Sequence, residues 1–161
     1  MRIKEYDREK AVEYATKWAL KRSPKYYDFS SIGGDCTNYI SQCLYAGSNI
    51  MNFAPVTGWY YVNANNRTAS WTDVDYLYKF LSNNKGVGPF CEQINQNELS
   101  LGDLVQLGNS ETDFYHSLIV TKIDNYKNIY LSSHSIDRLN QPIQTLNFNK
   151  IRYLKIKGVR I

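Results

Sequence analysis

The stretch from Gly33 to Gly47, GGDCTNYISQCLYAG, decides how the rest of the chain is interpreted. Two glycines form a flexible turn, and apolar residues then recur at helical spacing from Cys36 to Ala46. Gly47 directly follows this pattern, and glycine is common just past the end of a helix. We therefore expect a helix over residues 36–46 that carries a cysteine in its first turn.

A cysteine at this position has two interpretations. Unpaired backbone N–H groups and the helix dipole favour a thiolate at a helix N-terminus, which suits a nucleophile. A small apolar residue that merely packs at the start of a helix would look the same. Asp35 lies beside the thiol, where its charge would raise the thiol pKa, so we expect its side chain to turn away and cap the helix or tie the preceding loop.

Two further helices are predicted, one on each side of this segment. Asp7 can cap a helix that runs to about Lys21, because alanines and a tryptophan form one apolar stripe there. Thr72, followed three residues later by Asp75, resembles a capping box and predicts a helix to about Leu81.

The second half of the chain reads as strands. The segments GDLVQLG, HSLIVTKID, NIYLSSHS and IRYLKIKGVRI are short, rich in β-branched and aromatic residues, and separated by turn residues. Helices followed by strands predict an α+β fold, with the N-terminal helices packed on an antiparallel β-sheet. The 161 residues fit a single domain, 1–161.

Composition argues against a nucleic-acid-binding protein and against a protein that spans a membrane. The formal net charge is +4, but its basic residues are scattered or alternate with apolar ones near the C-terminus, so we expect no nucleic-acid site. No stretch approaches the apolar length of a membrane span, and no signal segment is visible. The compartment stays open, with secretion or a cell-envelope location as one option if a signal has been trimmed. The sequence leaves the oligomeric state undetermined.

The cysteines do not suggest a metal or a disulfide framework. Three cysteines are an odd number, so at least one thiol should be free. Cys36, Cys43 and Cys91 lack the close spacing of a zinc knuckle, and no glycine-rich phosphate loop is present. We expect no metal and no cofactor.

Both histidines lie in the strand region, and this placement favours the reactive interpretation of the cysteine. His116 opens one predicted strand and His134 lies near the end of the next. A hairpin that pairs the two would place both imidazoles on one face, where His116 could act as base and His134 could orient it. A register slip of one residue would turn His134 away, and Asp137 or Asn140 would then be the candidate orienter.

Several ordered motifs together resemble the putative amidase domain family. The motifs are GDCTNYISQCLYAG, WYY, SWTDVDYLYKFL, GDLVQLG and HSLIVTKI, and they span nearly the whole chain. More distantly, the chain is similar to the NlpC/P60 and CHAP hydrolases, which are papain-like. The resemblance implies a papain-like α+β fold with Cys36 as nucleophile and His116 as base. In the NlpC/P60 relatives the third residue is often histidine, which suits His134.

The resemblance also implies a reaction. We expect a cysteine amidase or peptidase that cleaves an amide bond in a peptide or in cell-wall peptidoglycan. Tyr27, by its distance before the cysteine, resembles a tyrosine that helps to stabilise the oxyanion in NlpC/P60 proteins. A thioester-forming acyltransferase and a catalytically silent envelope-binding module are the alternatives.

Overall fold

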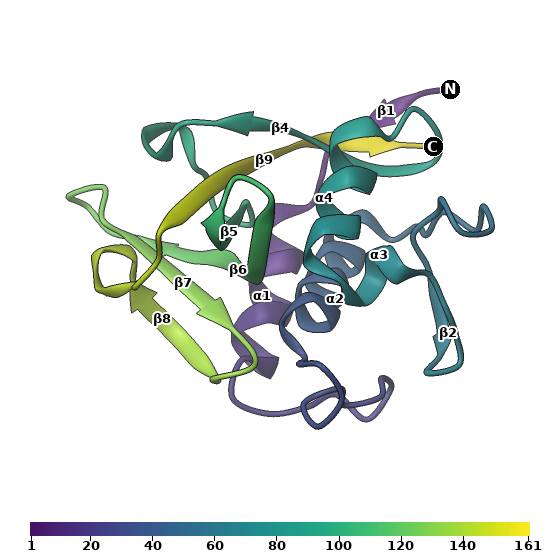
Figure 1. Cartoon of the computed structure of the whole chain (residues 1–161). Helices are drawn as coiled ribbons and strands as arrows, with labels where there is room; N and C mark the ends of the chain where they lie inside the picture. Colours follow the sequence, from purple (N-terminus) through teal and green to yellow (C-terminus); the bar gives the residue numbers. More distant parts are fainter.

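The fold has two layers, helices on one side and a curved antiparallel sheet on the other. The computed structural model describes residues 1–161 and has four α-helices. Figure 1 shows the helices packed against the sheet. The predicted α+β class is confirmed. No helix has the length and apolar character needed to cross a membrane.

The helices at Arg8 and Cys36 begin where the sequence predicts. The bounds of the helices are α1 Arg8–Trp18, α2 Cys36–Ser48, α3 Ala69–Thr72 and α4 Val74–Asn83. The Asp7 carboxylate caps α1 by accepting a hydrogen bond from the Lys10 N–H at 3.0 Å. At α4 the predicted capping residue is wrong: Asp73, rather than Thr72, accepts from the Tyr76 N–H at 3.0 Å. Thr72 instead ends the short helix α3.

Gly47 does not end α2 as predicted. The helix continues to Ser48, and Asn49 follows it in the left-handed conformation with φ of 55°. Gly47 is needed for packing, because a Cβ there would overlap the Tyr6 ring and lie 2.9 Å from the Asp7 carbonyl oxygen. Its small size lets the chain that leads into α1 lie directly on α2.

The main sheet has seven strands. The strands are β1 Ile3–Lys4, β4 Gly88–Ile94, β5 Leu104–Ser110, β6 Asp113–Ile123, β7 Ile129–Ser133, β8 Arg138–Pro142 and β9 Lys150–Arg160, and a separate hairpin is formed by β2 Tyr61–Asn63 and β3 Asn66–Arg67. The order is β1-β9-β5-β6-β7-β8, with β4 also paired to β9. The short 3₁₀ turns are η1 Gln96–Glu98 and η2 Ile143–Thr145. All four predicted strands are present.

Two apolar clusters cover opposite faces of the central strands. Leu104 and Ile119 belong to the larger cluster, which the helices cover, whereas Leu107 and Leu118 belong to a smaller cluster closed by β7 and η2. Strand alternation therefore places Ser117 on the helix side and His116, which pairs with Leu107, at the edge of the smaller cluster.

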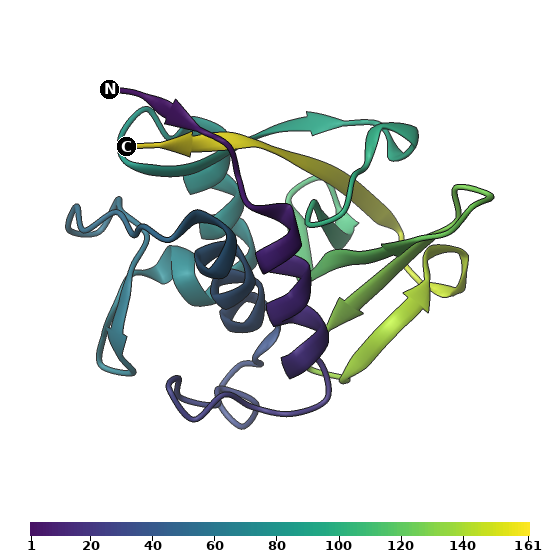
Figure 2. The ribbon, with the colours of Figure 1, turned by 180° about the vertical axis from the view of Figure 1, so that it is seen from behind.

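Both chain ends lie at one corner of the molecule. β1 pairs with β9, with Ile3 opposite Arg160, and Figure 2 shows the two termini side by side from behind.

Candidate active site

The turn before Cys36 is held by the connection between β7 and β8. Gly33 and Gly34 have φ of 82° and 104°, a region that favours glycine. The Ser135 hydroxyl accepts a hydrogen bond from the Asp35 N–H at 2.8 Å, and a Cβ on Gly34 would lie 3.1 Å from that hydroxyl oxygen. The backbone that leads into Cys36 is therefore held by the conformations of the two glycines and by the contact with Ser135.

Cys36 is the first residue of α2 and is almost buried, with 8% of its surface exposed. Its Sγ lies 3.7 Å from the Thr37 hydroxyl. Burial raises the pKa of the Cys36 thiol above its usual value, and the Ser117 N–H and the Thr37 hydroxyl only partly offset this effect. The Asp35 charge raises the pKa further. Cys36 is thus a neutral thiol near pH 7 in the free protein.

A chain of buried polar groups lies beneath the start of α2. The Thr37 hydroxyl is 3.1 Å from the Ser117 hydroxyl, which accepts from Gln106 Nε2 at 3.2 Å. Gln106 Nε2 also donates to the Val74 carbonyl, and Gln106 Oε1 accepts from Arg152 Nε at 2.8 Å. These bonds fix α2 against β5, β6 and β9. The sequence patterns did not predict these bonds, although a polar glutamine within the apolar run of GDLVQLG is a visible signal.

His116 lies on β6 next to the residues that contact the start of α2. Phe114 shares a small apolar cluster with Cys36, and Ser117 bonds to Thr37. The His116 imidazole is partly buried, and no hydrogen bond joins it to the Cys36 thiol. Burial, together with the positive charge of Arg138, lowers the pKa of His116 from 6.5 to about 4. The imidazole is therefore neutral near pH 7 and can accept a proton.

A cavity of about 350 Å³ opens beside His116. Its lining combines apolar, hydroxyl and amide side chains from β6, the β7–β8 turn and the segment after β8. The lining residues are Leu107, Tyr115, His116, Ser135, Ile136, Arg138, Gln141, Thr145, Leu146 and Asn147.

His134 does not lie opposite His116 as the predicted hairpin requires. The pairing of Ile119 with Ser132 shifts the register by one residue, and His134 falls in the turn after β7. Its Nδ1 is 2.6 Å from Asp35 Oδ2 and its Nε2 is 2.7 Å from the Trp18 carbonyl oxygen. Neither ring nitrogen is left for His116, because both already have partners.

The His134–Asp35 pair is one of the most buried polar contacts in the chain, with 1% of each side chain exposed. The Trp18 carbonyl can only accept, so Nε2 must carry a proton, and a second proton lies between Nδ1 and the carboxylate. The His134 ring also stacks on Tyr39 at 4.1 Å between centroids. The Asp35 carboxylate ties the preceding loop by accepting from the Phe29 N–H at 2.8 Å, and it does not cap α2.

The alternative orienters are also occupied elsewhere. Asp137 forms two hydrogen bonds to Arg22, at 2.8 and 3.0 Å, and Asn140 Oδ1 accepts from the Thr121 hydroxyl at 2.7 Å. Tyr27 exposes 43% of its surface, and its backbone carbonyl accepts from Asn38 Nδ2. None of these three forms a hydrogen bond with Cys36 or His116.

The polar residues after Cys36 hold the aromatic core. Asn38 Oδ1 accepts from the Trp71 indole at 3.0 Å, and the Ser41 hydroxyl accepts from the Trp59 indole at 3.0 Å. Gln42 Oε1 accepts from the Tyr14 hydroxyl at 2.6 Å. Both tryptophans are fully buried. The asparagine, serine and glutamine of the motif therefore position α2 and its neighbours rather than line the cavity beside His116.

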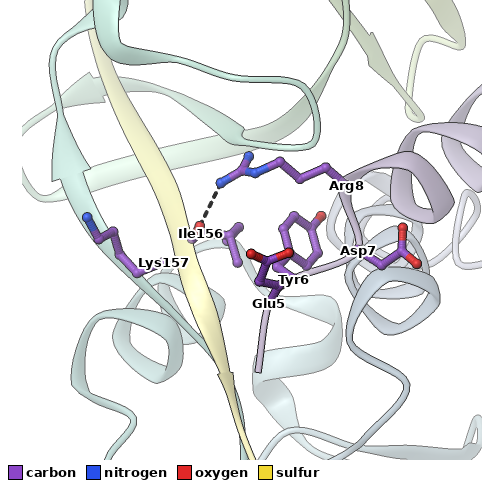
Figure 3. A pocket seen from close by; sticks show the side chains of 6 residues that line it. All are labelled: Glu5, Tyr6, Asp7, Arg8, Ile156 and Lys157. Atoms are coloured by element: carbon purple, nitrogen blue, oxygen red, sulfur yellow. Dashed lines mark hydrogen bonds between the residues drawn. The ribbon is translucent and has the colours of Figure 1, made fainter. Parts of the chain in front are cut away.

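A larger cavity, about 660 Å³, lies elsewhere, where the chain enters α1 near β9. Figure 3 shows Arg8 extending across it, with its guanidinium bonded to the Ile156 carbonyl at 2.7 Å. Arg8 also pairs with the buried Asp103 at 2.7 Å. These contacts join α1 to the sheet, and no cysteine, serine, threonine or histidine lines this cavity. Nowhere in the chain do three or more metal-binding side chains gather.

Residues 5–156 match the family model described as putative amidase domain. The chain belongs to this family. It is 36% identical over 123 residues to the uncharacterized protein YhbB of Bacillus subtilis, a match that covers 74% of this chain and 38% of that protein. It is 29% identical over 148 residues to the uncharacterized protein YjcM of the same organism, covering 87% of this chain and 33% of YjcM. The chain thus spans about a third of the length of these relatives, and no solved structure matches it.

Proposed function

We propose that this domain hydrolyses amide bonds, with Cys36 as nucleophile and His116 as general base. Family membership supports amide chemistry. The observation that carries the assignment of residues is the contact of α2 with β6 on both sides of His116 in sequence: Cys36 shares an apolar cluster with Phe114, and Thr37 bonds to Ser117.

The reaction proceeds through a thioester. His116 accepts the proton of the Cys36 thiol as sulfur attacks the amide carbonyl carbon, and the Cys36 N–H stabilises the oxyanion. The C–N bond then breaks, and the imidazolium of His116 gives its proton to the leaving amine. Water next attacks the thioester, His116 accepts a proton from it, and the C–S bond breaks to release the acid and restore the thiol.

The thiol and the imidazole form this pair only when substrate is bound. In the free protein both groups are neutral and no hydrogen bond joins them. Hydrogen bonds between catalytic groups often shorten only in the complex with substrate. In this proposal the proton leaves the thiol only during attack on the substrate, so no stored thiolate is required.

We assign His134 a positioning role in place of the orienting role expected from the sequence. It binds Asp35, the residue directly before the nucleophile, and links it to the end of α1 through the Trp18 carbonyl.

We propose that the substrate is a peptide or the peptide part of peptidoglycan. This choice rests on the resemblance to NlpC/P60 and CHAP hydrolases. The test is hydrolysis of purified peptidoglycan and a panel of short peptides, with products identified by mass spectrometry. The parent is compared with Cys36→Ser and with the matched control Cys91→Ser, because Cys91 is equally buried but lies on β4.

The proposal predicts a new amine from the parent and from Cys91→Ser, and none from Cys36→Ser. Release of product by Cys36→Ser would refute the assignment of the nucleophile. Transfer of the acyl group to an added amine such as glycinamide in preference to water would favour the acyltransferase alternative. Binding of peptidoglycan without cleavage by any of the three proteins would favour a silent binding module, for which the raised thiol pKa is the supporting observation.

A further inference from the structure

The cavity beside His116 is lined by one positively charged residue and by no negatively charged residue. Among its lining residues Arg138 is the only one charged near pH 7, and none is acidic. The remaining polar lining comes from hydroxyl and amide groups, which are short-range hydrogen-bonding partners. A ligand that enters this cavity therefore meets a single positive charge.

Arg138 lacks the anionic partner that three of the other six arginines of this chain have. Arg8, Arg22 and Arg152 each pair with an aspartate, at 2.7, 2.8 and 3.2 Å respectively. Arg138 is exposed and forms no ion pair, although Asp137 is its neighbour in sequence.

Asp137 forms no ion pair with Arg138, and both of its oxygens bind Arg22 instead, one at 2.8 Å and the other at 3.0 Å. The acidic residue closest in sequence is thus directed to the α1–α2 connection. This leaves the guanidinium of Arg138 free at the wall of the cavity.

We propose that the cavity beside His116 binds a carboxylate of the amide substrate through Arg138. This inference rests on the proposed function and narrows its substrate class to peptides with an acidic group near the scissile amide. A planar guanidinium presents paired N–H donors that match a carboxylate, and charge-assisted bonds of this kind are stronger than neutral ones.

The position of Arg138 would also couple recognition to catalysis. Its charge disfavours the protonated form of His116 in the free protein. A carboxylate bound to Arg138 offsets that charge, so the imidazole becomes a stronger base when an acidic substrate is present. A neutral substrate would lack both the binding contact and this effect.

The test measures binding without turnover. Isothermal titration of Cys36→Ser uses four N-acetylated alanine tetrapeptide amides that carry one glutamate, at each position in turn, and their four glutamine counterparts. The same titrations are made with Arg138→Gln and Arg138→Lys in the Cys36→Ser background. Arg2→Gln is the matched control, since Arg2 is also exposed without an ion pair but lies at the N-terminus.

We expect at least one glutamate peptide to bind about tenfold tighter than its glutamine counterpart, as for a charge-assisted hydrogen bond at a partly exposed site. Arg138→Gln should remove this preference, Arg138→Lys should keep part of it, and Arg2→Gln should leave it unchanged. The preference should shrink as salt rises. The inference is overturned if no glutamate peptide is preferred, or if the preference survives in Arg138→Gln.

Parallel hydrolysis assays separate this inference from the proposed function. A glutamate preference that depends on Arg138, together with no cleavage by the parent, would support the carboxylate site and contradict the amidase. Cleavage by the parent with equal binding of both peptide series would support the amidase and overturn the carboxylate site.

Discussion

Replacing His134 with alanine should destabilise the domain far more than replacing its partner Asp35 with asparagine. His134→Ala leaves the Asp35 carboxylate buried without its hydrogen-bond partner at 2.6 Å and removes the ring stacked on Tyr39. Removing the partner of a buried carboxylate typically lowers the free energy of unfolding by about 3–5 kcal/mol. Arg22 Nε lies 3.5 Å from the same carboxylate oxygen, so we expect the lower end, about 3 kcal/mol.

Asp35→Asn has a different outcome because the network can rearrange its protons. The new amide oxygen can still accept from the Phe29 N–H and Asn38 Nδ2, which both bond to Oδ1. The new amide nitrogen can donate to His134 Nδ1, and a neutral imidazole can keep its Nε2–H bond to the Trp18 carbonyl. Only the charge-assisted part is lost, a loss of about 1–2 kcal/mol.

The assay is urea unfolding at pH 7, followed by the fluorescence of the buried tryptophans, on the parent, both single variants and the double variant. The double variant should be less destabilised than the sum of the singles, because removing both partners leaves no unpaired charge. Equal destabilisation by the two single variants, or strict additivity in the double variant, would refute the interpretation of this pair.

Three further outcomes are expected. The free energy of unfolding should decrease as pH falls from 6.5 to about 4, because over this range His116 is protonated in the unfolded chain but not in the folded chain. The His116→Gln variant should lose that part of the pH dependence, which is measured from the urea midpoints at pH 7 and pH 5. Alkylation of Cys36 by iodoacetamide, mapped by mass spectrometry, should be slow at pH 7 and become faster above pH 9. Burial raises the pKa of Cys91 to about 11, so Cys91 should be alkylated more slowly than Cys36, and equally fast labelling of the two would contradict this order. Gly47→Ala should lower the unfolding free energy by about 1–3 kcal/mol through overlap with the Tyr6 ring, and a thermal midpoint equal to that of the parent would disprove this packing role.

The elements that the sequence predicted correctly have strong local signals. The helix at Cys36 and the four strands are marked by periodicity and by turn residues, so their positions could be read without tertiary information. Strands β4 and β8 could not be predicted in this way, because their sequences, GPFCEQI and RLNQP, lack sustained alternation of apolar and polar residues. These strands form by pairing with β9 and β7 respectively. Such strands depend on partners that are distant in the chain.

The arrangement of the candidate site also depends on pairing between segments that local sequence patterns do not reveal. Local sequence placed Cys36 at a helix start, but the register of the β6–β7 hairpin decided where His134 points, and a shift of one residue moved it to Asp35. Register follows from side-chain packing and from irregularities such as the β-bulge in this hairpin, which the sequence pattern does not reveal.

The pairing of the two chain ends makes the domain suitable for circular permutation. The backbones of Arg2 and Ile161 exchange two hydrogen bonds, at 3.0 and 2.9 Å, as in the last pair of a β-hairpin. A short turn could therefore join residue 161 to residue 1 without disturbing the sheet. New termini could open at the exposed tip of the β2–β3 hairpin, near Asn65. Figures 1 and 2 place the joined ends at the opposite end of the molecule from the α1–α2 connection, so the order of the chain could change while the surroundings of Cys36 stay the same.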